Sequence, residues 1–164
     1  MRFVTSLSVG LLLAGPLSAQ ENTSIHIAPI TFQNEELIER AIITDCDLPN
    51  VQLAELQRAT SGTSVTLAPQ LNDAGKILEI QIVNAVAGGN AFTGHQKGVT
   101  LVGKLFENDR EVASFSAMRS SGGGAFGGFK GSCAVLNRCA ETLAKDVATW
   151  LRKPTPGARL GELK

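Results

Sequence analysis

Residues 76–87 read KILEIQIVNAVA, and this stretch decides the fold because apolar and polar side chains alternate along it. Alternation with a period of two is typical of a strand with one buried face. Glu79 and Gln81 are expected on the polar face. The apolar face is expected to carry Leu78, Ile80, Ile82 and Val86.

Two further strands follow this one toward the C-terminus. Residues 99–106 and 110–118 are both rich in strand-forming residues, and Glu107-Asn108-Asp109 between them is a good hairpin turn. Three antiparallel strands in succession predict a meander.

A long amphipathic helix is predicted for residues 132–152, with Trp150 beside its apolar stripe and against the sheet edge. Pro154 and Pro156 should end this helix and leave residues 154–164 as a flexible tail. The apolar stripe consists of Leu136, Ala140, Leu143, Val147 and Leu151.

The N-terminal half adds shorter elements. Residues 24–32 predict a strand broken by Pro29, and residues 35–44 fit a helix or a strand equally. A second helix should begin near Asp47, a candidate cap, and end before Ser61-Gly62. The fold class expected is therefore α+β, a mixed or antiparallel sheet with two helices on one face. We expect residues 20–153 to form a single domain of this class.

Residues 122–131 (GGGAFGGFKG) form a glycine-rich loop. Nucleotide binding is rejected, because the loop follows an antiparallel hairpin rather than a parallel strand. The favoured interpretation is a connector whose Phe126 and Phe129 pack on the core. The alternative is a mobile lip that presents Phe126, Phe129 and Lys130 to a partner or an apolar ligand.

Three cysteines in an exported chain predict one disulfide and one free thiol. Cys133 and Cys139 cannot pair, because helical residues six apart are separated by about 9 Å of rise. Cys46 is expected to pair with Cys133, since the adjacent glycines let the backbone adjust. Cys139 is then a free thiol buried as a small hydrophobe. A catalytic thiol is the alternative, although no histidine lies near it in sequence.

No catalytic constellation is found in the sequence. His26 and His95 belong to no cluster with metal-ligand spacing, so no metal site is expected. No cofactor motif is found either, and the chain is not expected to be an enzyme.

Residues 1–19 predict a secretory signal peptide, with a positive Arg2, an apolar run and Ala19 before the cleavage site. The mature chain is expected to be soluble, periplasmic or secreted, and in an oxidising space. No cysteine follows the apolar run, so no lipid anchor is expected, and no later run is long enough to span a membrane. Removing Arg2 leaves 14 basic and 15 acidic residues, a net charge of −1. This balance gives no reason to expect nucleic acid as a partner.

Residues 122–151, together with Asp45-Cys46-Asp47-Leu48, resemble a family of exported proteobacterial proteins of unknown function. The likeness covers most of the mature chain. In layout the chain is similar to small periplasmic α/β domains of the TolB amino-terminal and LpoB type. The resemblance implies a sheet with two helices on one face and a role in the envelope, but it carries over no catalytic residues.

The function expected is a non-enzymatic exported module that binds another protein, with an envelope protein as its partner. The alternative is a small-molecule or lipid carrier that uses the loop of Phe126 and Phe129. A deep pocket between this loop and the helices would favour the carrier, whereas a flat surface or an exposed sheet edge would favour protein binding. The sequence sets no oligomeric state.

Overall fold

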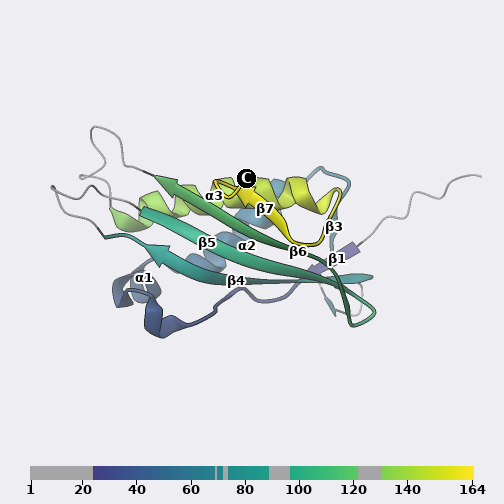
Figure 1. The fold of residues 1–164 in the computed structure, drawn as a ribbon, viewed down its shortest axis with the longest axis horizontal. Coiled ribbons are helices and arrows are strands. Elements are labelled where there is room, and N and C mark those ends of the chain that lie inside the picture. The colour runs from purple at the N-terminus through teal and green to yellow at the C-terminus, as the bar shows by residue number, and fades with distance from the viewer. Residues whose placement is uncertain (1–23, 69, 72–73, 89–96, 122–130) are drawn as a thin grey trace, which may run out of the picture.

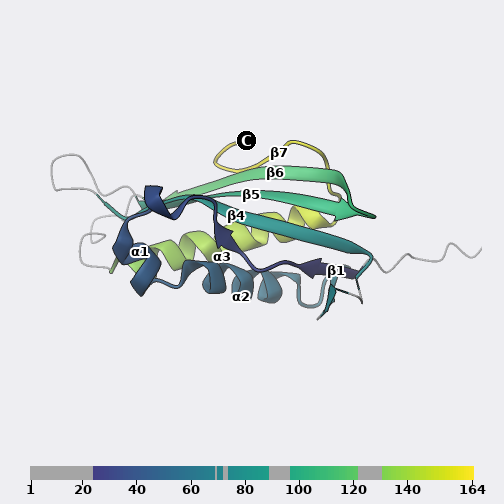
Figure 2. The ribbon, with the colours of Figure 1, turned by 90° about the horizontal axis from the view of Figure 1, so that it is seen from below.

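The computed structural model describes residues 24–68, 70–71, 74–88, 97–121 and 131–164. Within these ranges a mixed sheet of seven strands is covered on one face by helices, as Figures 1 and 2 show. The expected α+β class is confirmed.

The centre of the sheet is the predicted antiparallel meander, formed by β4 (Lys76–Val86), β5 (Lys97–Glu107) and β6 (Arg110–Ser121). Asn108 and Asp109 join β5 to β6 with φ of 51° and 61°. Two residues with positive φ make the tight turn whose twist matches that of paired strands. The sequence Asn-Asp therefore sets the register of this hairpin.

A bulge in β4 corrects the prediction for Val86. The register against β5 shifts between Ile82 and Asn84, so Val83 is an extra residue. One extra residue reverses which face the following side chains take. Ala85 is therefore buried, at 2% exposure, whereas Val86 is 42% exposed on the other face. The prediction that Val86 shares the face of Leu78 is wrong.

Short parallel strands flank β4 and make the sheet mixed. β1 (Ser24–Ile27) and β2 (Thr31–Phe32) pair with successive parts of β4, and β3 (Thr66–Leu67) pairs with β1. Pro29 lies between β1 and β2, where a missing backbone N–H is tolerated. The strand order is β3-β1-β4-β5-β6-β7.

The C-terminal residues form strand β7 (Ala158–Gly161), which pairs in parallel with β6. The side chain of Leu160 is buried at 7% exposure, and Glu162 N donates to Met118 O at 2.9 Å. The prediction of a flexible tail over residues 154–164 is wrong. The prolines end the helix as expected, but Leu160 then anchors the chain on the core.

Two long helices lie on the same side of the sheet (Figure 2). The helical elements are η1 (Glu35–Leu37), α1 (Arg40–Asp45), α2 (Leu48–Thr60) and α3 (Ser132–Leu151). Asp47 precedes α2 with φ of 43° and makes no side-chain cap bond. Its Oδ1 instead accepts from Asn50 Nδ2 at 2.8 Å.

The core lies between the sheet and α3, whose apolar stripe is buried as expected. Trp150 at the end of α3 packs edge-on against Phe115 of β6, with ring centroids 4.9 Å apart. Trp150 Nε1 also donates to Thr155 O at 3.2 Å. Gly103 of β5 lies under the Phe115 ring, because a Cβ there would overlap the ring atoms. The buried stripe residues of α3 are Leu136, Ala140, Leu143, Val147 and Leu151.

Candidate binding surface

A disulfide joins Cys46 to Cys133, the pair favoured by the sequence, with Cα atoms 5.0 Å apart and a sequence separation of 87 residues. Cys46 ends α1 and Cys133 lies in the first turn of α3. The bridge therefore ties the segment beside β4 to the N-terminal end of the long helix.

Cys139 is a free thiol, buried on α3. Burial raises its pKa above the ordinary value, and the charge of Glu162 adds to this effect. A thiol with a raised pKa holds little thiolate near neutral pH, and thiolate is the nucleophile. The environment of Cys139 therefore does not suit a catalytic thiol.

Two predicted features lie outside the described residues. They are the signal peptide at residues 1–19 and the loop residues Phe126, Phe129 and Lys130.

None of the described helices covers one face of the meander, and we call it the open face. Its side chains form rows across the strands, such as Gln81, Val102 and Ser116, which are exposed or half-buried. Lys104 and Glu111 pair on it at 3.0 Å, and this contact lowers the pKa of Glu111. The open face mixes apolar and polar groups, the composition of ordinary protein-binding surfaces.

The outer edge of β4 is paired along only part of its length. Ala28 N donates to Leu78 O and Gln33 N donates to Ile82 O, each at 2.9 Å. The backbone N–H and C=O groups of alternate residues point to the same edge of a strand. The bulge shifts this alternation by one residue, so that the groups of Ala85 and Ala87 point to the outer edge. No strand in the described ranges pairs with them on this side.

An apolar hollow of about 420 Å³ lies at this unpaired stretch. Leu37 of η1 forms one wall and is 73% exposed, and the exposed Val86 lies on the other side. We call the residues that line this hollow the open edge. They are Leu37 and Glu39 on one side and Ala85, Val86, Ala87 and Gly88 on the other. Exposed apolar side chains beside unpaired backbone are typical of a place where another chain adds to a sheet.

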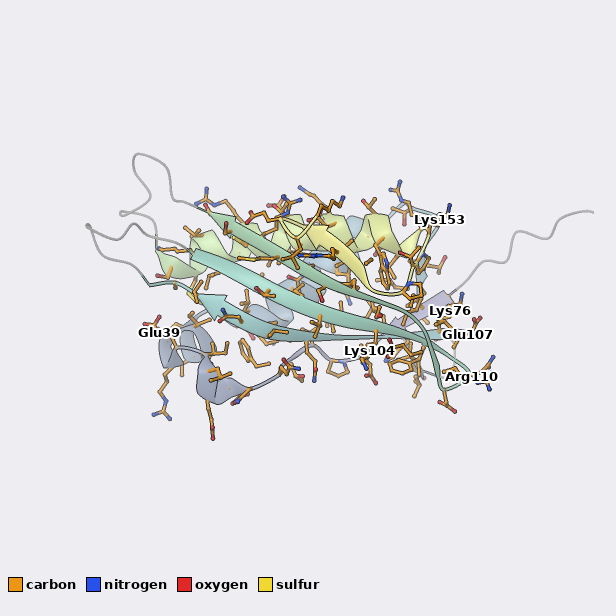
Figure 3. All side chains as sticks on the ribbon, viewed as in Figure 1. Glu39, Lys76, Lys104, Glu107, Arg110 and Lys153 are labelled. Carbon is orange, nitrogen blue, oxygen red and sulfur yellow. A yellow bond between two sulfur atoms is a disulfide. The ribbon has the colours of Figure 1, made fainter. Side chains whose placement is uncertain are left out.

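The surroundings of the open edge are acidic. Glu39 lines the hollow, Glu35 and Glu36 are exposed in the preceding η1, and Arg40 is the only cation of residues 35–45. Figure 3 shows Glu39 at one end of the molecule, while Lys76, Glu107, Arg110 and Lys153 lie toward the other.

The opposite edge, on β6, holds a smaller hollow of about 270 Å³ lined in part by Arg119, Cys139 and Glu162. Arg119 donates to both oxygens of Asp146, at 2.8 and 3.0 Å, which raises the pKa of Arg119. Ser120 donates from N and from Oγ to Glu162, at 2.9 and 2.7 Å. The charged groups here are engaged with one another, which leaves little to bind a ligand.

In the described part of the chain, no cluster of His, Cys, Asp and Glu could hold a metal ion. None of the described helices is both long and apolar enough to cross a membrane.

The chain is similar in fold to solved bacterial proteins. A protein of Xanthomonas campestris from the DUF330 family is 11% identical, with a TM-score of 0.60, and the match covers 79% of this chain and 82% of that one. Lipoprotein GNA1162 of Neisseria meningitidis is 14% identical, with a TM-score of 0.48, covering 60% and 83%. A minor lipoprotein of Acinetobacter baumannii is 12% identical, with a TM-score of 0.46, covering 79% and 92%.

No family model and no curated protein sequence matches the chain. At these identities the comparison shows a shared fold and transfers no activity.

The comparison corrects one prediction. The sequence predicted no lipid anchor, but the similar structures include lipoproteins, which carry one. The missing cysteine after the apolar run of residues 3–14 is too weak a basis for that conclusion, so the prediction is withdrawn.

The open edge does not show in the sequence. Residues 35–44 fit a helix or a strand equally, and no periodic pattern marks Leu37. The one available signal was the leucine between the acids Glu36 and Glu39, directly after a short strand.

Proposed function

We propose that this chain is an exported envelope protein that binds another protein and catalyses no reaction. The observation that carries the proposal is the continuity of the open edge with the open face, since Val86 belongs to both. Together they present unpaired backbone, exposed apolar side chains and a mixed polar surface. These are the features by which sheets recruit a partner chain.

The geometry favours a protein over a small apolar ligand. Carrier pockets enclose most of the surface of their ligand, and their walls are largely apolar side chains. The hollow at the open edge opens onto solvent, and part of its lining is the end of β4 with the following residue Ala87. The carrier alternative depends on Phe126 and Phe129 and gains no support from the described residues.

Export is part of the proposal. The predicted signal peptide at residues 1–19 supports it, and so does the disulfide between Cys46 and Cys133, because disulfides persist in oxidising compartments. We propose the periplasm as the location. The predicted likeness to TolB and LpoB domains stays a prediction, and it would suit a role in envelope assembly.

Photo-crosslinking in intact cells tests the proposal. A crosslinking amino acid is placed at Gln81 or Ser116 on the open face, and at Glu141 on the outer side of α3 as the control. We expect one discrete protein adduct from the open-face positions and none from Glu141. Equal labelling from all three positions, or no adduct from the open face, would contradict a protein-binding role.

A further inference from the structure

We infer that the open edge receives an extended segment of the partner, which adds as a strand beside Ala85–Ala87 and carries apolar side chains alternating with lysine or arginine. This inference deepens the proposed function and depends on it. Three separate properties of the open edge support it.

The first property is the unpaired backbone. β1 and β2 satisfy the outer carbonyls of Leu78 and Ile82, but β2 ends at Phe32 and the chain turns away into η1. No described strand pairs with Ala85 and Ala87 on this side, where their N–H and C=O groups continue the line of those that β1 and β2 pair. Because strands pair about 4.8 Å apart, an incoming segment would continue the line of β2 along β4.

The second property is the apolar hollow. Leu37 has 73% of its surface exposed, although a leucine gains free energy when it is buried. Val86 is exposed on the other side of the same hollow. An added strand would project alternate side chains to its two faces, so an apolar residue could fill the hollow and cover Leu37.

The third property is charge. Glu39 lines the hollow, and Glu35 and Glu36 are exposed in the same segment, where Arg40 is the one cation of residues 35–45. Complementary charge steers association and selects among partners of similar shape. A segment with lysine or arginine between its apolar residues would match this surface.

The same charge argues against a second copy of this chain at the open edge. Two copies paired edge to edge would bring Glu39 and its acidic neighbours close to their own equivalents. Like charges placed opposite one another are unfavourable. The occupant is therefore a different, basic chain.

The test is the affinity of the full chain for a defined probe, the labelled peptide acetyl-Lys-Val-Lys-Val-Lys-amide, followed by fluorescence anisotropy. The control peptide has the same side chains but N-methyl groups on both valine nitrogens, which remove their N–H donors. We expect at least tenfold weaker binding of the control peptide. We also expect binding of the parent peptide to weaken as salt is raised.

Matched variants locate the site. Leu37→Arg should weaken binding at least tenfold, because it adds a cation and removes the apolar wall. Leu71→Arg is the control, since Leu71 is also an exposed leucine, at 52%, but lies beside Ile77 and Phe106 instead of the open edge. Both positions are exposed, so both variants should fold.

Three results would each overturn the inference: no binding of the parent peptide, equal binding of the N-methylated peptide, or equal loss in Leu37→Arg and Leu71→Arg. Equal binding of the N-methylated peptide would mean that the hollow takes an apolar group without strand addition. In each case crosslinks from Gln81 and Ser116 could still form in cells, so the proposed function would stand without this inference.

Discussion

The two edges of the sheet differ in how fully other strands pair with them. On β6, strand β7 pairs with Phe115–Met118, Glu162 N donates to Met118 O, and the carboxylate of Glu162 accepts from Ser120. On β4, two short strands cover the first part, and the stretch around Ala85 is left without a strand. An exposed edge invites pairing with other chains, and proteins usually block it. β7 covers this part of β6, which we call the closed edge, whereas no strand in the described ranges covers β4 at Ala85 and Ala87.

The largest difference between the edges should appear in stability. Phe115 lies beneath the closed edge and packs on Trp150, so Phe115→Ala should lower the free energy of unfolding by about 3–5 kcal/mol. Leu37→Ala at the open edge should change it by less than about 0.5 kcal/mol, because the side chain is exposed. Urea denaturation of both variants measures the difference. A large loss from Leu37→Ala would mean that the open edge is part of the core.

The disulfide should stabilise the segment that walls the open edge. Replacing Cys46 and Cys133 together by alanine should lower stability by about 2–5 kcal/mol, because the bridge closes a long loop in the unfolded chain. Thiol titration of the denatured parent protein should give one free thiol, that of Cys139. Three thiols would contradict the bridge.

Gly161 tests how the closed edge is built. Its φ of 67° disfavours any side chain, and a Cβ would overlap Met118 O, so Gly161→Ala should cost about 1–3 kcal/mol. Gly157→Ala is the matched control, with φ of 64° but no atom within 4 Å of its Cβ position. Gly157→Ala should lower the free energy of unfolding by less than Gly161→Ala does. Equal losses in thermal denaturation would show that the close approach to β6 contributes nothing.

The smallest effect concerns pH. Hydrogen bonds from Ser120 N and Oγ lower the pKa of Glu162 below its ordinary value. A lowered pKa in the folded state stabilises the fold above the unfolded pKa, and this contribution is lost as the pH falls through the folded pKa. Amide exchange of Ser120 should therefore accelerate at acid pH, corrected for the intrinsic rate. Glu162→Gln should remove this pH dependence. If the exchange of Ser120 depended on pH in the variant as it does in the parent protein, the pH dependence would arise from another titrating group.

The closed edge could not be predicted from the sequence, although the meander and α3 could. The alternation from Leu78 to Ile82 and the stripe from Leu136 to Leu151 are strong because one face of each element is buried. Leu160, by contrast, lies close to prolines and glycines in a stretch too short to show a clear period. Its strand exists because the end of α3 brings it beside β6, which no local pattern encodes.

The open edge escaped prediction for a related reason. The extra residue Val83 leaves no mark in the sequence, yet it decides that Ala85 faces the core and Val86 the solvent. Helix geometry excluded a bridge between Cys133 and Cys139, and the glycines next to Cys133 then favoured it over Cys139 as the partner of Cys46. The loop of Phe126 and Phe129 stays a prediction.

Amide hydrogen exchange at Ala85 and Ala87 tests the central claim most directly, measured by NMR on the full chain with and without the lysine–valine peptide. We predict rapid exchange at Ala85 and Ala87 in the free protein and at least tenfold slower exchange with the peptide bound, while the amide of Glu162 at the closed edge stays unchanged. The claim would be contradicted if both alanine amides exchanged slowly in the free protein, or if the bound peptide protected other amides and left these two unprotected.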